Sequence, residues 1–146
     1  MFALPLIETL LMDQQKQQQQ QQGGGEGRYN SGRGRRSGPR ALVLNPTREL
    51  AMQTAKVFQT YAKAAASSSS GPLRVALTTS GASVGRQKRT VLDADVVVAT
   101  PGRILQFVDE RVVSLSSVQE VVVDEADRML DLGFEPQLRR IARAAY

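Results

Sequence analysis

Short apolar runs alternate with longer amphipathic runs through most of this sequence, and the alternation limits the possible fold more than any other feature. The short runs are 41–44 (ALVL), 73–79 (LRVALTT), 95–99 (DVVVA) and 118–123 (VQEVVV). Brief, valine-rich runs of this kind are typical of strands that are buried on both faces of a parallel sheet. The sequence therefore predicts an α/β fold with a doubly wound parallel sheet.

Helices are predicted between and around these strands. The expected segments are 2–12, 47–65, 84–92, a helix that Pro101 opens and that runs to about Arg111, and most of 124–145. The helix over 47–65 is expected to bury one stripe of side chains: Leu50, Thr54, Val57, Phe58, Tyr61, Ala62 and Ala65.

Residues 14–40 differ in composition from the rest of the chain. A glutamine run (14–22) is followed by a Gly/Arg-rich segment (23–40) with five arginines and a single acidic residue, Glu26. Neither part carries enough apolar surface to offset chain entropy, so 14–40 is predicted to be a disordered insert. Two interpretations of its arginines stay open, loose contact with RNA and a solvated linker.

Composition narrows the possible ligands and compartments. The formal net charge is +5, which favours a polyanionic partner such as RNA or DNA. The chain has no cysteine and no histidine, so a bound metal must have oxygen ligands, which favours magnesium over zinc. We expect neither a signal peptide nor a membrane span, and an intracellular, soluble protein whose compartment, nucleus or cytoplasm, the sequence does not distinguish.

Polar clusters follow three of the four predicted strands. They are NPTREL after 41–44, ATPGR after 95–99 and DEAD (124–127) after 118–123. In parallel sheets the ligand site lies beyond the carboxyl ends of the strands, so these clusters are the candidate site.

The acidic cluster after the last strand suits nucleotide chemistry. Asp124, Glu125 and Asp127 lie within four positions, a pattern typical of a metal ion held against a phosphate. One carboxylate can hold hydrated Mg²⁺, and its neighbour can orient or deprotonate the attacking water. The alternative is that acidic residues simply favour a helix N-terminus.

The other two clusters suit phosphodiesters. Thr47 with Arg48, and Thr100 with Arg103, each combine a hydroxyl, a helix N-terminus and an arginine. Either alone is an ordinary helix start, but two on one edge indicate an extended polyanion. Gly81 and Gly85 lie after the second strand but are not a phosphate loop, because the chain contains no Gly-Lys pair.

Together these motifs resemble the first RecA-like domain of DEAD-box RNA helicases, over residues 1–12 and 41–146. PTRELA looks like the family's motif Ia, TPGR like motif Ib, and VVDEADRMLDLGF like motif II with its following helix. Residues 80–87 are similar to the double-glycine motif, with Ser80 where the first glycine is usual. MFALPLIETLL matches the helix that follows the phosphate loop, with Met1 where a small residue is usual.

The resemblance implies a RecA-like sheet of the P-loop NTPase type, with ATP and Mg²⁺ as cofactors and RNA as partner. It implies that Asp124 binds Mg²⁺ through water and that Glu125 is the general base. It also implies that Asp127 couples the nucleotide site to motif III, the family's Ser-Ala-Thr motif. The implied contacts with the RNA backbone, independent of base sequence, are made by Pro46, Thr47, Arg48, Gly81, Gln87, Thr100, Gly102 and Arg103.

The same comparison implies that the domain is incomplete. Residues 1–13 are expected to be the helix after an absent phosphate loop, 14–40 an insert, and 41–146 the remainder of the ATP-binding domain, without motif III or the second RecA-like domain. Two functions stay open: part of an ATP-dependent RNA helicase, inactive by itself, or a non-catalytic RNA-binding or interaction fragment.

Overall fold

The computed structural model describes residues 3–21, 38–65 and 72–146. Its strands are β1 (Ala41–Leu44), β2 (Val75–Thr78), β3 (Val96–Ala99) and β4 (Glu120–Val123). Its helices are α1 (Ala3–Gln21), α2 (Arg48–Ala64), α3 (Val84–Leu92), α4 (Pro101–Asp109), α5 (Ala126–Asp131) and α6 (Glu135–Ala145).

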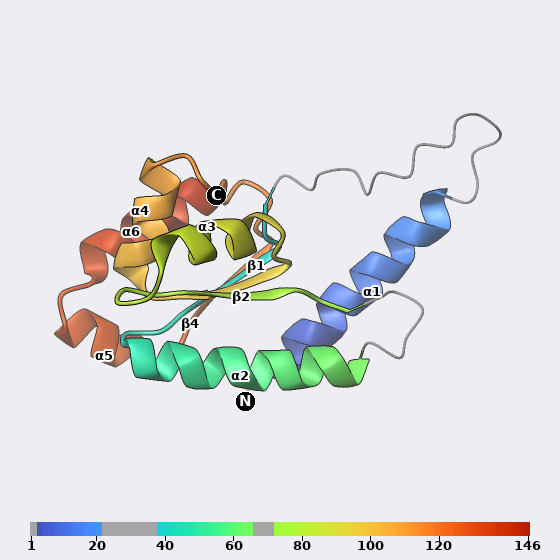
Figure 1. Cartoon of the computed structure of the whole chain (residues 1–146), viewed down its shortest axis with the longest axis horizontal. Coiled ribbons are helices and arrows are strands. Elements are labelled where there is room, and N and C mark those ends of the chain that lie inside the picture. The colour runs from blue at the N-terminus through green and yellow to red at the C-terminus, as the bar shows by residue number, and fades with distance from the viewer. Residues whose placement is uncertain (1–2, 22–37, 66–71) are drawn as a thin grey trace.

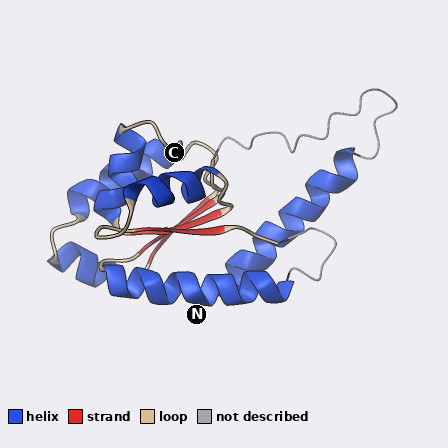
Figure 2. Ribbon diagram, in the orientation of Figure 1, coloured by secondary structure: helices blue, strands red, loops and turns tan. Residues whose placement is uncertain are grey.

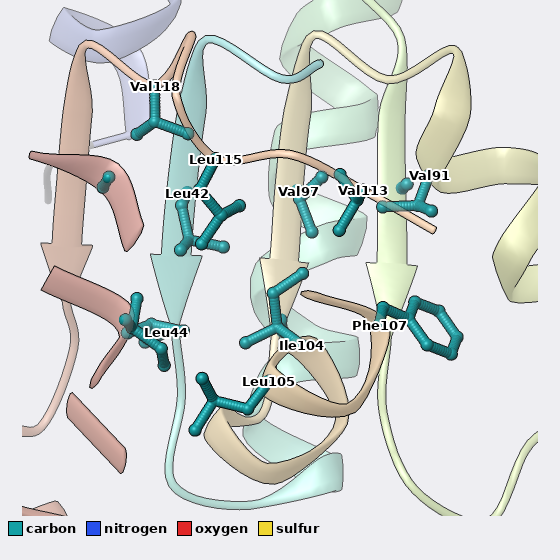
Figure 3. Packing of buried hydrophobic residues seen from close by; sticks show 14 of the residues in the cluster. Leu42, Leu44, Val91, Val97, Ile104, Leu105, Phe107, Val113, Leu115 and Val118 are labelled. Carbon is teal, nitrogen blue, oxygen red and sulfur yellow. The ribbon is translucent and has the colours of Figure 1, made fainter. Parts of the chain in front are cut away.

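The four strands form one parallel sheet in the order β2-β3-β1-β4. All four arrows point the same way in Figure 3. Helices α1 and α2 cover one face, whereas α3, α4 and α6 cover the other (Figures 1 and 2). The predicted α/β doubly wound sheet is confirmed.

Successive residues of the central strands feed two separate cores. Leu42 and Leu44 of β1 pack with Ile104 and Phe107 of α4 on one face, part of which Figure 3 shows. Ala41 and Val43 join α1 and α2 on the other face. All residues of β1 and β3 are buried, as expected for strands covered on both sides, whereas β2 and β4 at the sheet edges are partly exposed.

Helix α2 buries a different stripe from the predicted one. Its buried residues are Ala51, Ala55, Phe58 and Ala62, whereas Val57 is 44% exposed. The alanines allow α2 to lie close to the sheet, and the bulky Phe58 fills the remaining space. The prediction gave weight to large side chains and therefore placed the stripe partly on the wrong face.

The expected start of the insert at residue 14 is wrong, because α1 continues to Gln21. Glutamine is a good helix former, and the apolar turns before it provide the nucleus from which a helix extends. The buried residues Leu6, Ile7 and Leu10 anchor those turns on the sheet. Residues 22–37 lie outside the described part of the chain.

The expected end of the insert is also wrong, because residues 38–40 belong to the folded domain. Arg40 is 6% exposed, and its Nη1 donates to the carbonyl of Leu10 at 3.0 Å. Its Nη2 lies 3.8 Å from Oδ1 of Asp95. Arg40 therefore ties α1 to the amino edge of the sheet. Its place in a Gly/Arg-rich run of the sequence gave no indication of this role. Among the described residues, no helix is both long enough and apolar enough to span a membrane.

Candidate functional site

The residues that follow the four strands form one row along the carboxyl edge of the sheet. The strands are in level register there, since Leu44 is paired with both Ala99 and Val123, and Ala99 with Thr78. The row is continued by backbone hydrogen bonds from Thr100 N to Thr78 O (3.1 Å), Asn45 N to Ala99 O (2.9 Å) and Asp124 N to Leu44 O (2.9 Å). The three predicted clusters therefore lie on one edge, and α2 and α5 both begin there (Figure 1).

The start of α2 combines a capped helix N-terminus with an exposed arginine. Thr47 is the N-cap, and its Oγ1 accepts a hydrogen bond from Leu50 N at 3.3 Å. Pro46 is buried behind it, whereas the neighbouring Arg48 is exposed. A positively charged side chain beside the positive end of a helix is a favourable place for a phosphate.

Arg48 packs against the glycine loop that follows β2. A Cβ atom added to Gly81 would lie 2.7 Å from Arg48 Nη1. Gly81 also has a φ of +77°, a conformation that side chains other than glycine rarely adopt. Two residues predicted to bind RNA, distant in sequence, are thus neighbours in the fold.

Gln87, also predicted to contact RNA, is buried instead of lying on the exposed edge. Its Oε1 accepts from Thr79 N at 3.1 Å, and its Nε2 donates to Thr79 O at 2.8 Å. The Gln87 amide thus pairs with the backbone N–H and C=O of Thr79 just after β2, as a neighbouring strand would. Gln87 shapes the loop that carries Gly81, and its side-chain polar groups are already occupied.

The start of α4 is more open than that of α2. Thr100 is the N-cap residue, but its side chain makes no capping hydrogen bond, and a Cβ at Gly102 would meet nothing within 4 Å. The Arg103 guanidinium lies over the ring of Phe107, with Cζ 5.9 Å from the centroid. Its Nη1 is buried and has no hydrogen-bond partner among the described residues.

A further cation borders the same helix. Lys88 Nζ lies 6.0 Å from the Phe107 centroid and 2.6 Å from Oε2 of Glu110. The hydrogen bond from Lys88, with a second one from Gln106, lowers the pKa of Glu110 below its usual value. Lys88 is thus engaged with Glu110.

The acidic cluster lies where β4 ends and α5 begins. Asp124 is half-buried, and its Oδ2 accepts from Asn45 Nδ2 at 3.1 Å. Glu125 has a φ of +52°, an uncommon backbone conformation for this residue that is often found at functional sites. Its Oε2 lies 3.5 Å from Arg128 Nη1, and an open depression is lined by Glu125, Ala126, Asp127 and Arg128.

The three carboxylates do not converge on one ion. Within the described ranges, no group of three or more acidic, histidine or cysteine side chains could hold a metal ion together. The left-handed turn at Glu125 and the start of α5 separate the side chains that the sequence brings together. Any metal here is therefore bound by few protein oxygens and by other ligands.

A family model described as DEAD/DEAH box helicase matches residues 1–146. The chain belongs to this family.

Two curated relatives share almost half of the aligned residues with this chain. The chain is 46% identical over 104 residues to the DEAD-box ATP-dependent RNA helicase 52A of Oryza sativa subsp. japonica, and 44% identical over 104 residues to the ATP-dependent RNA helicase dbp3 of Sclerotinia sclerotiorum. These alignments cover 70% and 71% of this chain but 16% of each relative. The chain therefore spans about a sixth of the length of these relatives.

Solved DEAD-box structures share the fold. The yeast DEAD-box splicing factor Prp28 matches with a TM-score of 0.70 and 35% identity, over 75% of this chain and 24% of that one. A DEAD box protein from Methanococcus jannaschii matches with a TM-score of 0.67 and 32% identity, over 77% of this chain and 29% of that one. The fold is accordingly the RecA-like sheet of DEAD-box domains.

Within this DEAD-box domain, sequence reasoning gave no role of its own to Asn45 in the NPTREL cluster, and placed Thr54 only in the buried stripe of its helix. Asn45 is fully buried, and its Nδ2 lies 3.1 Å from both Thr54 Oγ1 and Asp124 Oδ2. The available signal was a polar residue, Asn45, directly after a strand that is buried on both faces. It could not be used without the strand order, which places β1 beside β4.

Proposed function

We propose that this chain is part of the first RecA-like domain of an ATP-dependent RNA helicase, which couples RNA-stimulated ATP hydrolysis to unwinding or remodelling of RNA. The row along the carboxyl edge carries the proposal, because one edge holds the acidic cluster and two arginine-bearing helix N-termini. The relatives named above are RNA helicases, which supports the same function.

In this proposal the RNA backbone lies along the starts of α2 and α4. Arg48 and Arg103 contact phosphates, the first beside Gly81 and the second from the first turn of α4. The empty space around Gly102 lets the sugar–phosphate chain approach the backbone at the start of α4. Pro46, Thr47 and Thr100 form the starts of the two helices. Gln87 acts indirectly, by shaping the loop that carries Gly81. Such contacts carry no base information, so binding is independent of sequence.

The acidic cluster serves the nucleotide. The oxygen-only donors and the half-buried Asp124 carboxylate fit a hydrated Mg²⁺ ion, which when bound neutralises charge on the phosphates of ATP. Asp124 holds the ion through water, Glu125 accepts a proton from the attacking water, and Asp127 couples the nucleotide site to motif III. Because Glu125 and Asp127 are exposed beside an open depression, a ligand can reach both.

We further propose that residues 1–146 alone do not hydrolyse ATP. The chain contains no Gly-Lys pair and hence no lysine of a phosphate loop. The second candidate function, non-catalytic RNA binding, is favoured by the same observation, because the RNA-facing residues need no nucleotide. The two candidates share the RNA site and differ in whether ATP is turned over.

The test common to both is the salt dependence of RNA binding. All variants are made in a parent protein in which Arg28, Arg33, Arg35 and Arg36 are replaced by serine, because these arginines could bind RNA unaided. Losing one phosphate contact should reduce the slope of log affinity against log salt by about one unit in Arg48→Ala and in Arg103→Ala. The loss should be equal for unrelated single-stranded RNAs.

Arg139→Ala is the matched control, since Arg139 is engaged with Glu135 on α6 at 2.7 Å. Its slope should equal that of the parent. Unchanged affinity and slope in both Arg48→Ala and Arg103→Ala would exclude the proposed RNA site.

A further inference from the structure

Asn45 links the helix that begins the RNA site to the carboxylate that begins the nucleotide site. Its backbone N donates to Ala99 O at 2.9 Å, which fixes the residue between β3 and β4. Its side-chain NH₂ group donates to Thr54 Oγ1 on α2 and to Asp124 Oδ2, both at 3.1 Å. The side chain is fully buried, so water does not compete freely for these bonds.

The orientation of the amide follows from its partners. A carboxylate oxygen only accepts hydrogen bonds, so the NH₂ group of Asn45, and not Oδ1, must face Asp124. Asn45 Oδ1 has no hydrogen-bond partner among the described residues. The amide is therefore held through its NH₂ group alone.

As a result, one oxygen of the Asp124 carboxylate, Oδ2, is engaged in a hydrogen bond. Its backbone is fixed by the hydrogen bond to Leu44 O at 2.9 Å, and its Oδ2 by Asn45. Oδ1 makes no hydrogen bond to the described residues, so it is the oxygen that remains for a ligand. An oriented donor behind a metal-binding carboxylate fixes the carboxylate's rotation and contributes to metal affinity.

We propose that Asn45 is a positioning residue that holds Asp124 Oδ2 and so presents Oδ1 to hydrated Mg²⁺. This inference rests on the proposed role of Asp124 in the nucleotide site. It predicts one side-chain rotamer for Asp124 even without metal, and a weaker metal site when the Asn45 donor is lost.

The rotamer is measured without metal or activity. Three-bond couplings from Asp124 Cγ to its backbone nitrogen and carbonyl carbon report χ1 in the isotope-labelled chain. We expect couplings of a single rotamer in the wild type, and averaged couplings in Asn45→Ala. Thr78→Val, which alters another buried polar residue at a strand end, should leave them unchanged.

Asn45→Ser is the second variant if Asn45→Ala does not fold, and its shorter side chain should also give averaged couplings. Averaged couplings in the wild type, or wild-type couplings in a folded Asn45 variant, would overturn the proposal.

Metal binding is measured with Mn²⁺, whose paramagnetism broadens nearby amide signals. Asn45→Ala should raise the Mn²⁺ concentration that half-broadens the Asp124 signal by about 10-fold. Asp124→Asn should abolish this broadening, and adding Asn45→Ala to it should have no further effect. Equal Mn²⁺ affinity in the wild type and Asn45→Ala would overturn the role of Asn45 toward the metal.

The two measurements separate failure of this inference from failure of the proposed function. Broadening that persists in Asp124→Asn would exclude the metal role of Asp124 itself, and with it the presentation of Oδ1 to Mg²⁺. The coupling measurement would then still decide whether Asn45 orients the Asp124 side chain.

Discussion

Arg48 and Gly81 are in direct contact, although one begins α2 and the other follows β2. A Cβ atom at Gly81 would lie 2.7 Å from Arg48 Nη1, closer than two such atoms can approach. The absence of a side chain at residue 81 is therefore what allows the Arg48 guanidinium its present position.

Gly81→Ala should weaken RNA binding by displacing Arg48. It should also destabilise the fold by about 1–2 kcal/mol, because the φ of +77° is strained for alanine. RNA affinity is measured by fluorescence anisotropy and stability by urea unfolding. Gly85→Ala is the control, since Gly85 lies in α3 and a Cβ there meets nothing within 4 Å. Equal RNA affinity in the two variants would contradict a role for the Arg48–Gly81 contact.

Residues 1–146 should show no ATP hydrolysis that RNA stimulates, because the chain has no Gly-Lys pair with which to bind the phosphates. Steady-state phosphate release is measured with Mg²⁺, with and without single-stranded RNA. Glu125→Gln, which removes the proposed base, should not differ from the wild type. The prediction fails if release rises on adding RNA and this rise is lost in Glu125→Gln.

Arg40→Ala should destabilise the domain by about 3 kcal/mol, because it removes a buried arginine that is paired with the buried Asp95 carboxylate. It also removes the hydrogen bond to Leu10 O that anchors α1. Arg74→Ala is the control, since Arg74 is half-exposed and lies 3.9 Å from the exposed Asp93; its cost should stay below about 1 kcal/mol. Similar costs in urea unfolding would show that Arg40 is not an anchor.

The link between Lys88 and Glu110 should depend on pH. Hydrogen bonds from Lys88 and then Gln106 lower the pKa of Glu110 from 4.5. Because the folded-state pKa is depressed, the stabilisation is present above about pH 4.5 and is lost as the pH falls through the folded value. Glu110→Gln should therefore be less stable than the wild type at neutral pH, and this small difference should disappear at lower pH.

Lys88→Gln provides the control for the pH dependence. In that background Glu110→Gln should cause a smaller pH-dependent change in the free energy of unfolding, since the largest cause of the shift is gone. An undiminished change would assign the effect to another partner of Glu110.

The sequence by itself determined the fold class and the edge of the sheet on which the candidate site lies. Valine-rich runs such as 95–99 are buried only when both faces of the sheet are covered. The helical periodicity between these runs indicates helices that connect parallel strands. Because carboxyl ends of parallel strands share an edge, Thr100 and Asp124 could be placed together before any contact was known. Helix starts were also predictable, since Thr47 and Pro101 carry local signals that do not depend on tertiary contacts.

Tertiary structure decided whatever depends on residues distant in the sequence. Arg40 belongs to a Gly/Arg-rich run, and only the proximity of Leu10 and Asp95 makes it a buried anchor. Gln87 is polar and lies among basic residues, yet the fold buries it because its amide completes the backbone bonding of Thr79. Asn45 is adjacent to Asp124 only because β1 and β4 are neighbours, and strand order is a property of the whole sheet, which the local pattern of residues does not contain.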